Sequence, residues 1–147
     1  MPEESHITAS ALETMALGER LSAALSPQKL VVLSGNLGAG KTTLVKGIVE
    51  GFKAAPSAQV TSPTFTLIHE YRSPKIDIYH IDLYRIQTLR ELETLGLDDL
   101  LGERSLLLIE WGEKFERFRR ECDVEISLQS MGDDRRRISI RSRDKER

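Results

Sequence analysis

Apolar positions near the start of the chain follow the period of an α-helix. Apolar residues between Leu12 and Leu25 recur at helical intervals, and Pro27 follows them. Ser10 and Glu13 stand at the start of this run with the spacing of a capping box, a pair that satisfies free backbone groups at a helix start. The pattern predicts an amphipathic helix that begins after Ser10 and ends before Pro27.

A short apolar run then changes into a second helical pattern. Residues 30–33 are apolar and partly β-branched, and a Gly-rich segment follows them. Apolar residues within 44–49 then recur at helical spacing, and Gly51 ends the run. We expect a buried strand, a loop and a helix in that order.

The middle of the chain indicates a hairpin followed by two short helices. Residues 65–71 and 76–83 are rich in β-forming residues, and a turn-forming segment separates them. Residues 88–95 and 97–101 have helical character on either side of Gly96. The hairpin is expected to be antiparallel.

A buried strand and a second hairpin complete the pattern. Residues 105–109 are almost continuously apolar, as in a central parallel strand, and alternation at 124–128 and 138–140 indicates a terminal hairpin. A strand–loop–helix start combined with two hairpins predicts a mixed sheet with a parallel centre and antiparallel hairpins. The fold class is therefore α/β, with three layers, and residues 1–147 form a single domain.

Composition narrows the setting of this domain. The 147 residues carry a net charge of −2, Cys122 is the single cysteine, and no apolar run is long enough to cross a bilayer. Residues 1–10 lack the pattern of a secretory signal, so we expect a cytoplasmic protein without membrane contact. The slight negative charge argues against extensive direct contact with nucleic acid. His6 and the charged tail 142–147 are expected to be disordered.

The Gly-rich segment carries the strongest chemical signal. Gly35, Gly40, Lys41 and Thr42 satisfy the pattern G-x-x-x-x-G-K-[ST] between a predicted strand and a predicted helix, where a P-loop must lie. Such a loop turns backbone N–H groups toward phosphates, Lys41 adds a cation, and the Thr42 hydroxyl suits Mg²⁺. The alternative is a chance Gly-rich turn, which the strand and helix on either side disfavour. The sequence predicts a P-loop NTPase-like fold.

Two acidic residues at strand ends are candidates for magnesium and catalysis. A P-loop protein needs a carboxylate at the end of a neighbouring apolar strand, and Glu110 stands there. Asp82 ends the other β-rich run and is a second candidate, for the outer shell of the metal. For Glu110 the alternative is a surface carboxylate at a strand end. Trp111 follows Glu110 and is expected at the mouth of the site, whereas packing or a surface role is expected for His80 rather than metal binding.

The sequence favours ATP over GTP and hydrolysis over transfer. No N-K-x-D segment, which GTPases use to read guanine, follows Glu110. Residues 61–64 lie where switch loops sense the γ-phosphate, although a plain Pro-containing turn is the alternative. A small-molecule kinase remains the main rival, but no Arg-rich lid or second-substrate pocket is evident.

Several motifs together carry a resemblance to a known family. They are 35–43 (GNLGAGKTT), 62–67 (SPTFTL), 80–85 (HIDLYR) and 109–111 (IEW). In this order, they resemble the bacterial TsaE family, also called YjeE, over nearly the whole chain. The resemblance implies an ATPase that is weak alone and serves the synthesis of threonylcarbamoyladenosine beside the tRNA anticodon. It also implies docking on the TsaB–TsaD pair, with ATP binding and hydrolysis resetting that complex between turnovers and tRNA contacted only indirectly.

The resemblance also implies roles for individual residues. Phosphate binding would fall on Gly38, Ala39, Gly40, Lys41, Thr42 and Thr43. Thr42 and Glu110 would ligate Mg²⁺, and Asp82 would support catalysis together with Lys41. Ser62 and Thr64 would belong to a switch loop, and adenine would lie near the start of the first helix, around Thr8 to Ser10. An adaptor that needs ATP binding but not hydrolysis remains a second hypothesis, which the sequence does not separate from the first.

Overall fold

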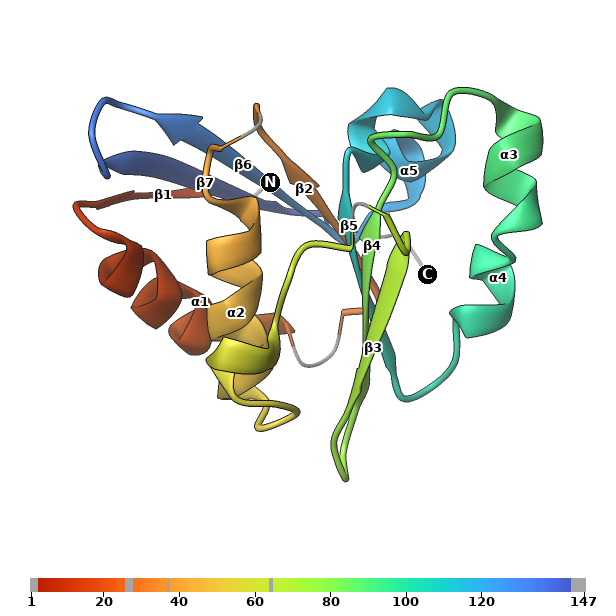
Figure 1. The fold of residues 1–147 in the computed structure, drawn as a ribbon, viewed down its shortest axis with the longest axis horizontal. Helices are drawn as coiled ribbons and strands as arrows, with labels where there is room; N and C mark the ends of the chain where they lie inside the picture. Colours follow the sequence, from red (N-terminus) through yellow and green to blue (C-terminus); the bar gives the residue numbers. More distant parts are fainter. Residues whose placement is uncertain (1–2, 26–27, 37, 64, 144–147) are drawn as a thin grey trace.

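The computed structural model describes residues 3–25, 28–36, 38–63 and 65–143 (Figure 1). Seven strands of these residues form one mixed sheet in the order β1-β7-β6-β2-β5-β4-β3. The strands are β1 (Glu3–Thr8), β2 (Leu30–Ser34), β3 (Ile68–Arg72), β4 (Asp77–Asp82), β5 (Ser105–Glu110), β6 (Val124–Ser130) and β7 (Arg136–Ser142).

Helices lie on both faces of the sheet, which confirms the three-layer α/β fold. Helices α1 and α2 cover one face, and α3, α4 and α5 lie on the other (Figure 1). The helices are α1 (Ala11–Leu25), α2 (Lys41–Gly51), α3 (Leu89–Thr94), α4 (Leu97–Leu100) and α5 (Glu116–Glu121), with 3-10 turns η1 (Ser57–Gln59) and η2 (Gly112–Lys114). No helix of the described ranges is both long and apolar enough to span a membrane.

The centre of the sheet is parallel, as the sequence predicts. Strand β2 pairs in parallel with β5 and β6, and β4 pairs in parallel with β5. Every residue of β5 is buried, because helices cover both of its faces. The register places Leu33 and Asp82 on either side of Glu110. The carboxyl ends of β2, β4 and β5 therefore meet at one edge of the sheet.

The core divides at the sheet because neighbouring residues of a strand point to opposite faces. Leu33 and Leu108 belong to the cluster under α1 and α2, whereas Val32 and Leu107 belong to the cluster under α3, α4 and α5. Gly18 allows α1 and α2 to approach closely, since a Cβ there would lie 2.4 Å from the Leu44 carbonyl oxygen. This contact fixes α2, and with it the loop before α2, against the sheet.

Both predicted hairpins are present, and the predicted start of α1 is close to the observed one. Strands β3 and β4 pair antiparallel, as do β6 and β7. The Glu13 N–H donates to Ser10 Oγ at 3.1 Å, and the Glu13 carboxylate accepts from the Ala9 N–H at 3.0 Å. The return bond of the capping box thus reaches Ala9 rather than Ser10.

The ends of the chain are more ordered than the sequence suggests. The prediction that His6 is disordered is wrong, because His6 lies in β1 opposite Ile138 of β7. Ser142 ends β7, and the Arg143 N–H donates to the Asp123 carbonyl oxygen at 2.9 Å. The rest of the predicted tail, residues 144–147, lies outside the described residues.

Candidate nucleotide-binding site

The loop between β2 and α2 has a backbone that requires glycine. Gly35, Gly38 and Gly40 have φ angles of 147°, 79° and 103°, which residues with a Cβ rarely adopt. A Cβ at Gly35 would also lie 2.6 Å from the Leu128 carbonyl oxygen. Space is open around Gly38, where no described heavy atom lies within 4 Å of an added Cβ. The loop therefore exposes its backbone to a ligand at Gly38.

Helix α2 begins directly at the end of this loop and presents its positive end there. Gly40 is the residue before the helix, and the Leu44 N–H makes a helical bond to its carbonyl oxygen at 3.0 Å. The N–H groups of a first helical turn have no partner within the helix, and the helix dipole adds positive potential. A phosphate at this position would accept hydrogen bonds from these free N–H groups and would be attracted by the positive potential of the helix dipole.

Lys41, the first residue of α2, is buried although it carries a charge. Its side chain is held by two contacts: Nζ donates to the Gly35 carbonyl oxygen at 2.5 Å and lies 3.8 Å from the centroid of the Trp111 ring. Burial lowers the pKa of Lys41 below its usual 10.5, and the negative charges of Glu110, Glu113 and Asp82 offset part of this effect. The buried ammonium is a poorly hydrated cation, which suits the binding of an anion, whereas the acidic groups beside it suit a metal ion.

A cavity of about 310 Å³ at the carboxyl edge of the sheet brings most of the predicted residues together. The residues that line it are Gly38, Gly40, Lys41, Thr42, Thr43, Ser62, Asp82, Glu110, Trp111 and Arg136. Ala39 is buried beneath the loop and does not line the cavity. Thr64, the other switch-loop candidate, lies outside the described residues.

The two predicted carboxylates are buried neighbours on adjacent parallel strands. Asp82 and Glu110 are each 4% exposed and lie opposite each other in the register of β4 and β5. Asp82 Oδ1 accepts from the Tyr84 N–H at 2.8 Å, and Glu110 Oε2 contacts His80 Nε2. Glu110 is thus not the surface carboxylate that the sequence left as its alternative.

The donor set fits magnesium. The Thr42 hydroxyl and the carboxylates of Asp82 and Glu110 offer oxygen atoms around one cavity. Within the described chain, no group of at least three His, Cys, Asp or Glu side chains is placed to hold a metal by itself. This small number of protein ligands suits Mg²⁺, which keeps several waters and takes phosphate oxygens in nucleotide sites.

Ser10, the predicted adenine contact, lies close to the loop but is engaged in capping α1. Its Oγ accepts from the Glu13 N–H, and Ser10 does not line the main cavity. The next residue, Ala11, lines a small cavity of about 40 Å³ beside Gly40 and Thr43. The start of α1 therefore lies next to the P-loop, and the assignment of adenine to Ser10 stays a prediction.

Arg136 is a cavity residue that the sequence motifs do not include. Arg136 lies at the start of β7 and lines both cavities, and its Nη2 donates to the Gly38 carbonyl oxygen at 3.3 Å. No sequence motif predicts this contact, because it depends on the position of the β6–β7 hairpin beside β2. Arg136 adds a second cation to the site.

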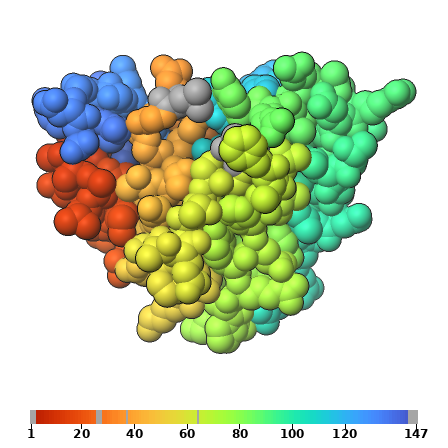
Figure 2. All heavy atoms as spheres, in the orientation of Figure 1, coloured from red at the N-terminus to blue at the C-terminus, as the bar shows by residue number. Residues whose placement is uncertain are grey.

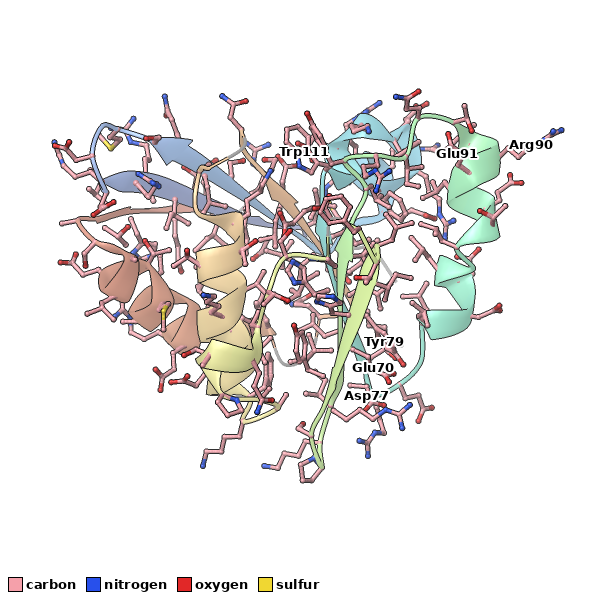
Figure 3. The ribbon with its side chains drawn as sticks, in the orientation of Figure 1. Glu70, Asp77, Tyr79, Arg90, Glu91 and Trp111 are labelled. Carbon is pink, nitrogen blue, oxygen red and sulfur yellow. The ribbon has the colours of Figure 1, made fainter. Side chains whose placement is uncertain are left out.

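Trp111 lies at the edge of the sheet that holds the site. Figure 3 shows it there, well away from Glu70, Tyr79 and Asp77 on the β3–β4 hairpin. Its φ of 64° is unusual for a residue with a side chain and turns the chain from β5 into η2. Its ring lies against Lys41 and is 5.1 Å from the Tyr84 ring.

A larger cavity, of about 590 Å³, lies at the opposite edge of the sheet. Lys29, Lys53, Lys75 and Arg104 are among its lining residues, and Glu103 is the acidic one. It lacks a Gly-rich loop and a helix start. Size alone therefore does not identify the site, whereas the loop, the helix start and the buried ionisable groups do.

A strand, a glycine loop and a helix start, with carboxylates at the ends of neighbouring strands, define the class: a P-loop α/β protein. A sequence profile of the family described as "Threonylcarbamoyl adenosine biosynthesis protein TsaE" matches residues 8–138. The chain belongs to the TsaE family. Its place is thus among the proteins of the threonylcarbamoyladenosine modification of tRNA.

Relatives and a solved structure agree with this family. The chain is 38% identical to a Bacillus subtilis protein over 128 residues, which cover 87% of this chain and 78% of the relative. It is 35% identical to a Rickettsia conorii protein over 141 residues, which cover 96% and 79%. Both relatives are called tRNA threonylcarbamoyladenosine biosynthesis protein TsaE.

The crystal structure of Bacillus subtilis YdiB matches the fold with a TM-score of 0.71 at 30% identity. The match covers 96% of this chain and 86% of the YdiB chain. The α/β fold predicted from the sequence is confirmed at the level of the whole sheet.

Proposed function

We propose that this protein is a Mg²⁺-dependent ATPase that acts with TsaB and TsaD in the threonylcarbamoyladenosine modification of tRNA next to the anticodon. The observation that carries the proposal is the convergence of Lys41, Thr42, Asp82 and Glu110 on one cavity beside the P-loop. Each is a residue type that phosphate or magnesium chemistry requires.

Within this site each group has a distinct task. The backbone of Gly38 to Thr43 cradles the phosphates, and Lys41 neutralises the β and γ phosphates after leaving the Gly35 carbonyl oxygen. Thr42 and Glu110 would hold Mg²⁺, which would supply positive charge to offset the negative charge that develops on the phosphates during hydrolysis. Asp82 supports the attacking water, and Arg136 adds positive charge beside Gly38.

The base is adenine rather than guanine in this proposal. The chain lacks the N-K-x-D segment of guanine-specific proteins after Glu110. The small cavity lined by Ala11, Thr14, Gly40 and Thr43 supports this, because the start of α1 lies beside the P-loop there. Ser10, at this start, is the proposed neighbour of the adenine.

In this proposal TsaB and TsaD, rather than this chain, contact the tRNA. The net charge of −2 provides no broad positive field for a nucleic acid backbone. The face in Figure 2 joins the N-terminal helices, the segment after α2 and the β3–β4 region in one continuous surface. ATP binding at the carboxyl edge of the sheet, followed by hydrolysis, resets the TsaB–TsaD complex between turnovers.

The first test is ATP hydrolysis by the purified protein, alone and with the TsaB–TsaD pair. Lys41→Ala serves as the blank, and Lys75→Ala in the exposed β3–β4 turn is the matched control. We expect weak hydrolysis alone, strong stimulation by the pair, and loss of both only in Lys41→Ala. Absence of binding to the pair, or stimulation that survives in Lys41→Ala, would refute the proposal and leave a small-molecule kinase as the next hypothesis.

Glu110→Gln separates a hydrolysing enzyme from an adaptor that needs only ATP binding. The substitution keeps the shape of the side chain but removes its charge. We expect the variant to bind ATP, to assemble with TsaB–TsaD and to fail in repeated tRNA modification. Normal multiple-turnover modification by Glu110→Gln would show that ATP binding alone suffices.

A further inference from the structure

His80 is a completely buried polar residue inside the proposed site. It lies on β4 two residues before Asp82, and the register of β4 and β5 puts Asp82 opposite Glu110. His80, Asp82 and Glu110 consequently share the sheet face that α2 covers. His80 Nε2 contacts Glu110 Oε2, and the His80 side chain is 0% exposed.

The hydrogen-bond partners of His80 determine which of its nitrogens carries the proton. Nδ1 is buried and has no hydrogen-bond partner in the part of the chain that the structure describes. An unpaired buried N–H is rarer and less favourable than an unpaired acceptor, so the proton belongs on Nε2. His80 therefore donates to Glu110 through Nε2, and the Glu110 oxygen accepts.

The other polar groups of the site are held elsewhere. Lys41 Nζ donates to the Gly35 carbonyl oxygen and lies over Trp111, while Asp82 Oδ1 accepts from the Tyr84 N–H. The bond to His80 uses one oxygen of the Glu110 side chain, Oε2. Because Glu110 lines the cavity, its other oxygen, Oε1, is the one proposed to face a ligand there.

A packing role alone does not explain a histidine at this position. The neighbouring residues on the same face, Ile78 and Leu108, are apolar and fully buried. A leucine would fill such a position without leaving a polar nitrogen unpaired, whereas a buried imidazole is unfavourable unless its bond to Glu110 matters. His69, opposite His80 on β3, is only half-buried and contacts the Thr61 carbonyl oxygen.

We propose that His80 is a positioning residue that holds Glu110 in the orientation required to coordinate Mg²⁺ or one of its waters. The inference rests on the proposed function, in which Glu110 meets Mg²⁺ at the bound nucleotide. Hydrogen bonds to a coordinating carboxylate orient it, and their loss lowers metal affinity by about 10- to 100-fold. Nothing in the sequence pattern announces this role, because His80 and Glu110 are far apart along the chain.

The matched pair of variants is His80→Gln and His80→Asn, whose amide groups lie at different distances from the backbone. The amide nitrogen of His80→Gln can occupy the place of Nε2 and donate to Glu110, whereas that of His80→Asn reaches only the place of Nδ1. His80→Leu removes the donor altogether. Thermal unfolding of each variant establishes that it folds, and the Gln and Asn pair decides the question if His80→Leu does not fold.

The measurement is the gain in ADP affinity that Mg²⁺ produces, read from the fluorescence of Trp111, the only tryptophan of the chain. Affinity is measured in EDTA and over a range of Mg²⁺ concentrations, without any need for hydrolysis. We expect His80→Asn and His80→Leu to require about 10- to 100-fold more Mg²⁺ for half of the gain. His80→Gln should stay within about threefold of wild type, and affinity in EDTA should be the same in all.

Equal Mg²⁺ dependence in wild type and His80→Asn would overturn the positioning role. A parallel loss of affinity in EDTA and with Mg²⁺ would also overturn it, because that result indicates general damage to the site. Failure of the proposed function looks different: wild type would not bind ADP, or Glu110→Gln would show the same Mg²⁺ gain as wild type.

Discussion

The two ends of strand β4 carry similar chemical groups in opposite surroundings. At its carboxyl end, Asp82 lies beside Glu110 and close to Lys41, all of them buried. At its amino end, Asp77 lies in the β3–β4 hairpin with Glu70 and other charged residues near solvent (Figure 3). The chain thus places charges in its interior at one end of the strand and leaves them at the surface at the other.

The pKa shifts follow from this difference. Burial is the largest cause of the lowered pKa of Lys41. On the hairpin, hydrogen bonds from Arg72 and Tyr79 are the main reason that the pKa of Glu70 is lowered, and the bond to Glu70 raises the pKa of Tyr79. Desolvation therefore governs the pKa of Lys41, and hydrogen-bonded pairs govern the pKa values of Glu70 and Tyr79.

The difference between the two ends of β4 indicates where buried charges lower the free energy of unfolding. Buried charges reduce the free energy of unfolding unless they are well paired, whereas exposed pairs contribute about 0 to 1 kcal/mol. Burying Lys41, Asp82 and Glu110 therefore fits the proposed ligand chemistry better than a role in folding. Substitutions at the two ends of β4 should affect different properties.

The largest expected difference is between Asp82→Asn and Asp77→Asn. Asp82→Asn should lower the partner-stimulated rate of ATP hydrolysis by about 100-fold, because it removes the proposed support of the attacking water. Asp77→Asn, at the other end of the same strand, should leave the rate within about twofold, since a surface change of this kind is usually mild. Equal rates for the two variants would contradict the division between the ends.

A second comparison uses arginines. Arg136→Ala should weaken ATP binding by about tenfold, because a charged donor beside Gly38 is lost. Arg72→Ala on the hairpin is the control, and its affinity should match that of wild type. Calorimetric titration with a non-hydrolysable ATP analogue measures both, and unchanged affinity in Arg136→Ala would remove Arg136 from the site.

A smaller effect concerns the stability of the protein without nucleotide. The folded state lowers the pKa of Lys41, so between that lowered pKa and 10.5 the unfolded chain binds more protons than the folded chain. The free energy of unfolding of wild type should therefore rise with pH across this window relative to Lys41→Met. Below the window Lys41→Met should be the more stable protein. Urea unfolding from pH 7 upward tests this sign, and a difference that is independent of pH would contradict it.

The smallest effect is expected at the hairpin. Glu70→Gln weakens the hydrogen bond that raises the pKa of Tyr79 and removes the negative charge that adds to it, so this pKa should return toward 10.0. Stability should change by less than about 0.5 kcal/mol, because Glu70 is exposed. Ultraviolet titration of the tyrosines, with Tyr79→Phe to assign the signal, checks the shift. Loss of ATP hydrolysis in Glu70→Gln would show that the hairpin belongs to the site.

Local sequence patterns were sufficient for the parts of the fold that depend on neighbours in the chain. The P-loop, α2 and the buried strand β5 follow from glycine positions and apolar periods, and the structure places them as expected. Helix α5 is absent from the elements predicted above, because its residues are mostly charged and Phe118 is the buried apolar residue among them. Strand β1 was also not predicted, for a different reason: it pairs with β7, whose residues lie at the other end of the chain.

The sequence by itself determined the class of the protein, its family and the motif residues that line the proposed nucleotide site. The class, the family and these residues follow from short motifs such as the one ending at Lys41 and Thr42. In such a motif, residues that are neighbours along the chain are also neighbours in the folded structure. Only the tertiary structure decided that Arg136 reaches the P-loop and that His80 meets Glu110. Those contacts join separate strands, and strand order in a sheet is set by packing of the whole core rather than by any local pattern.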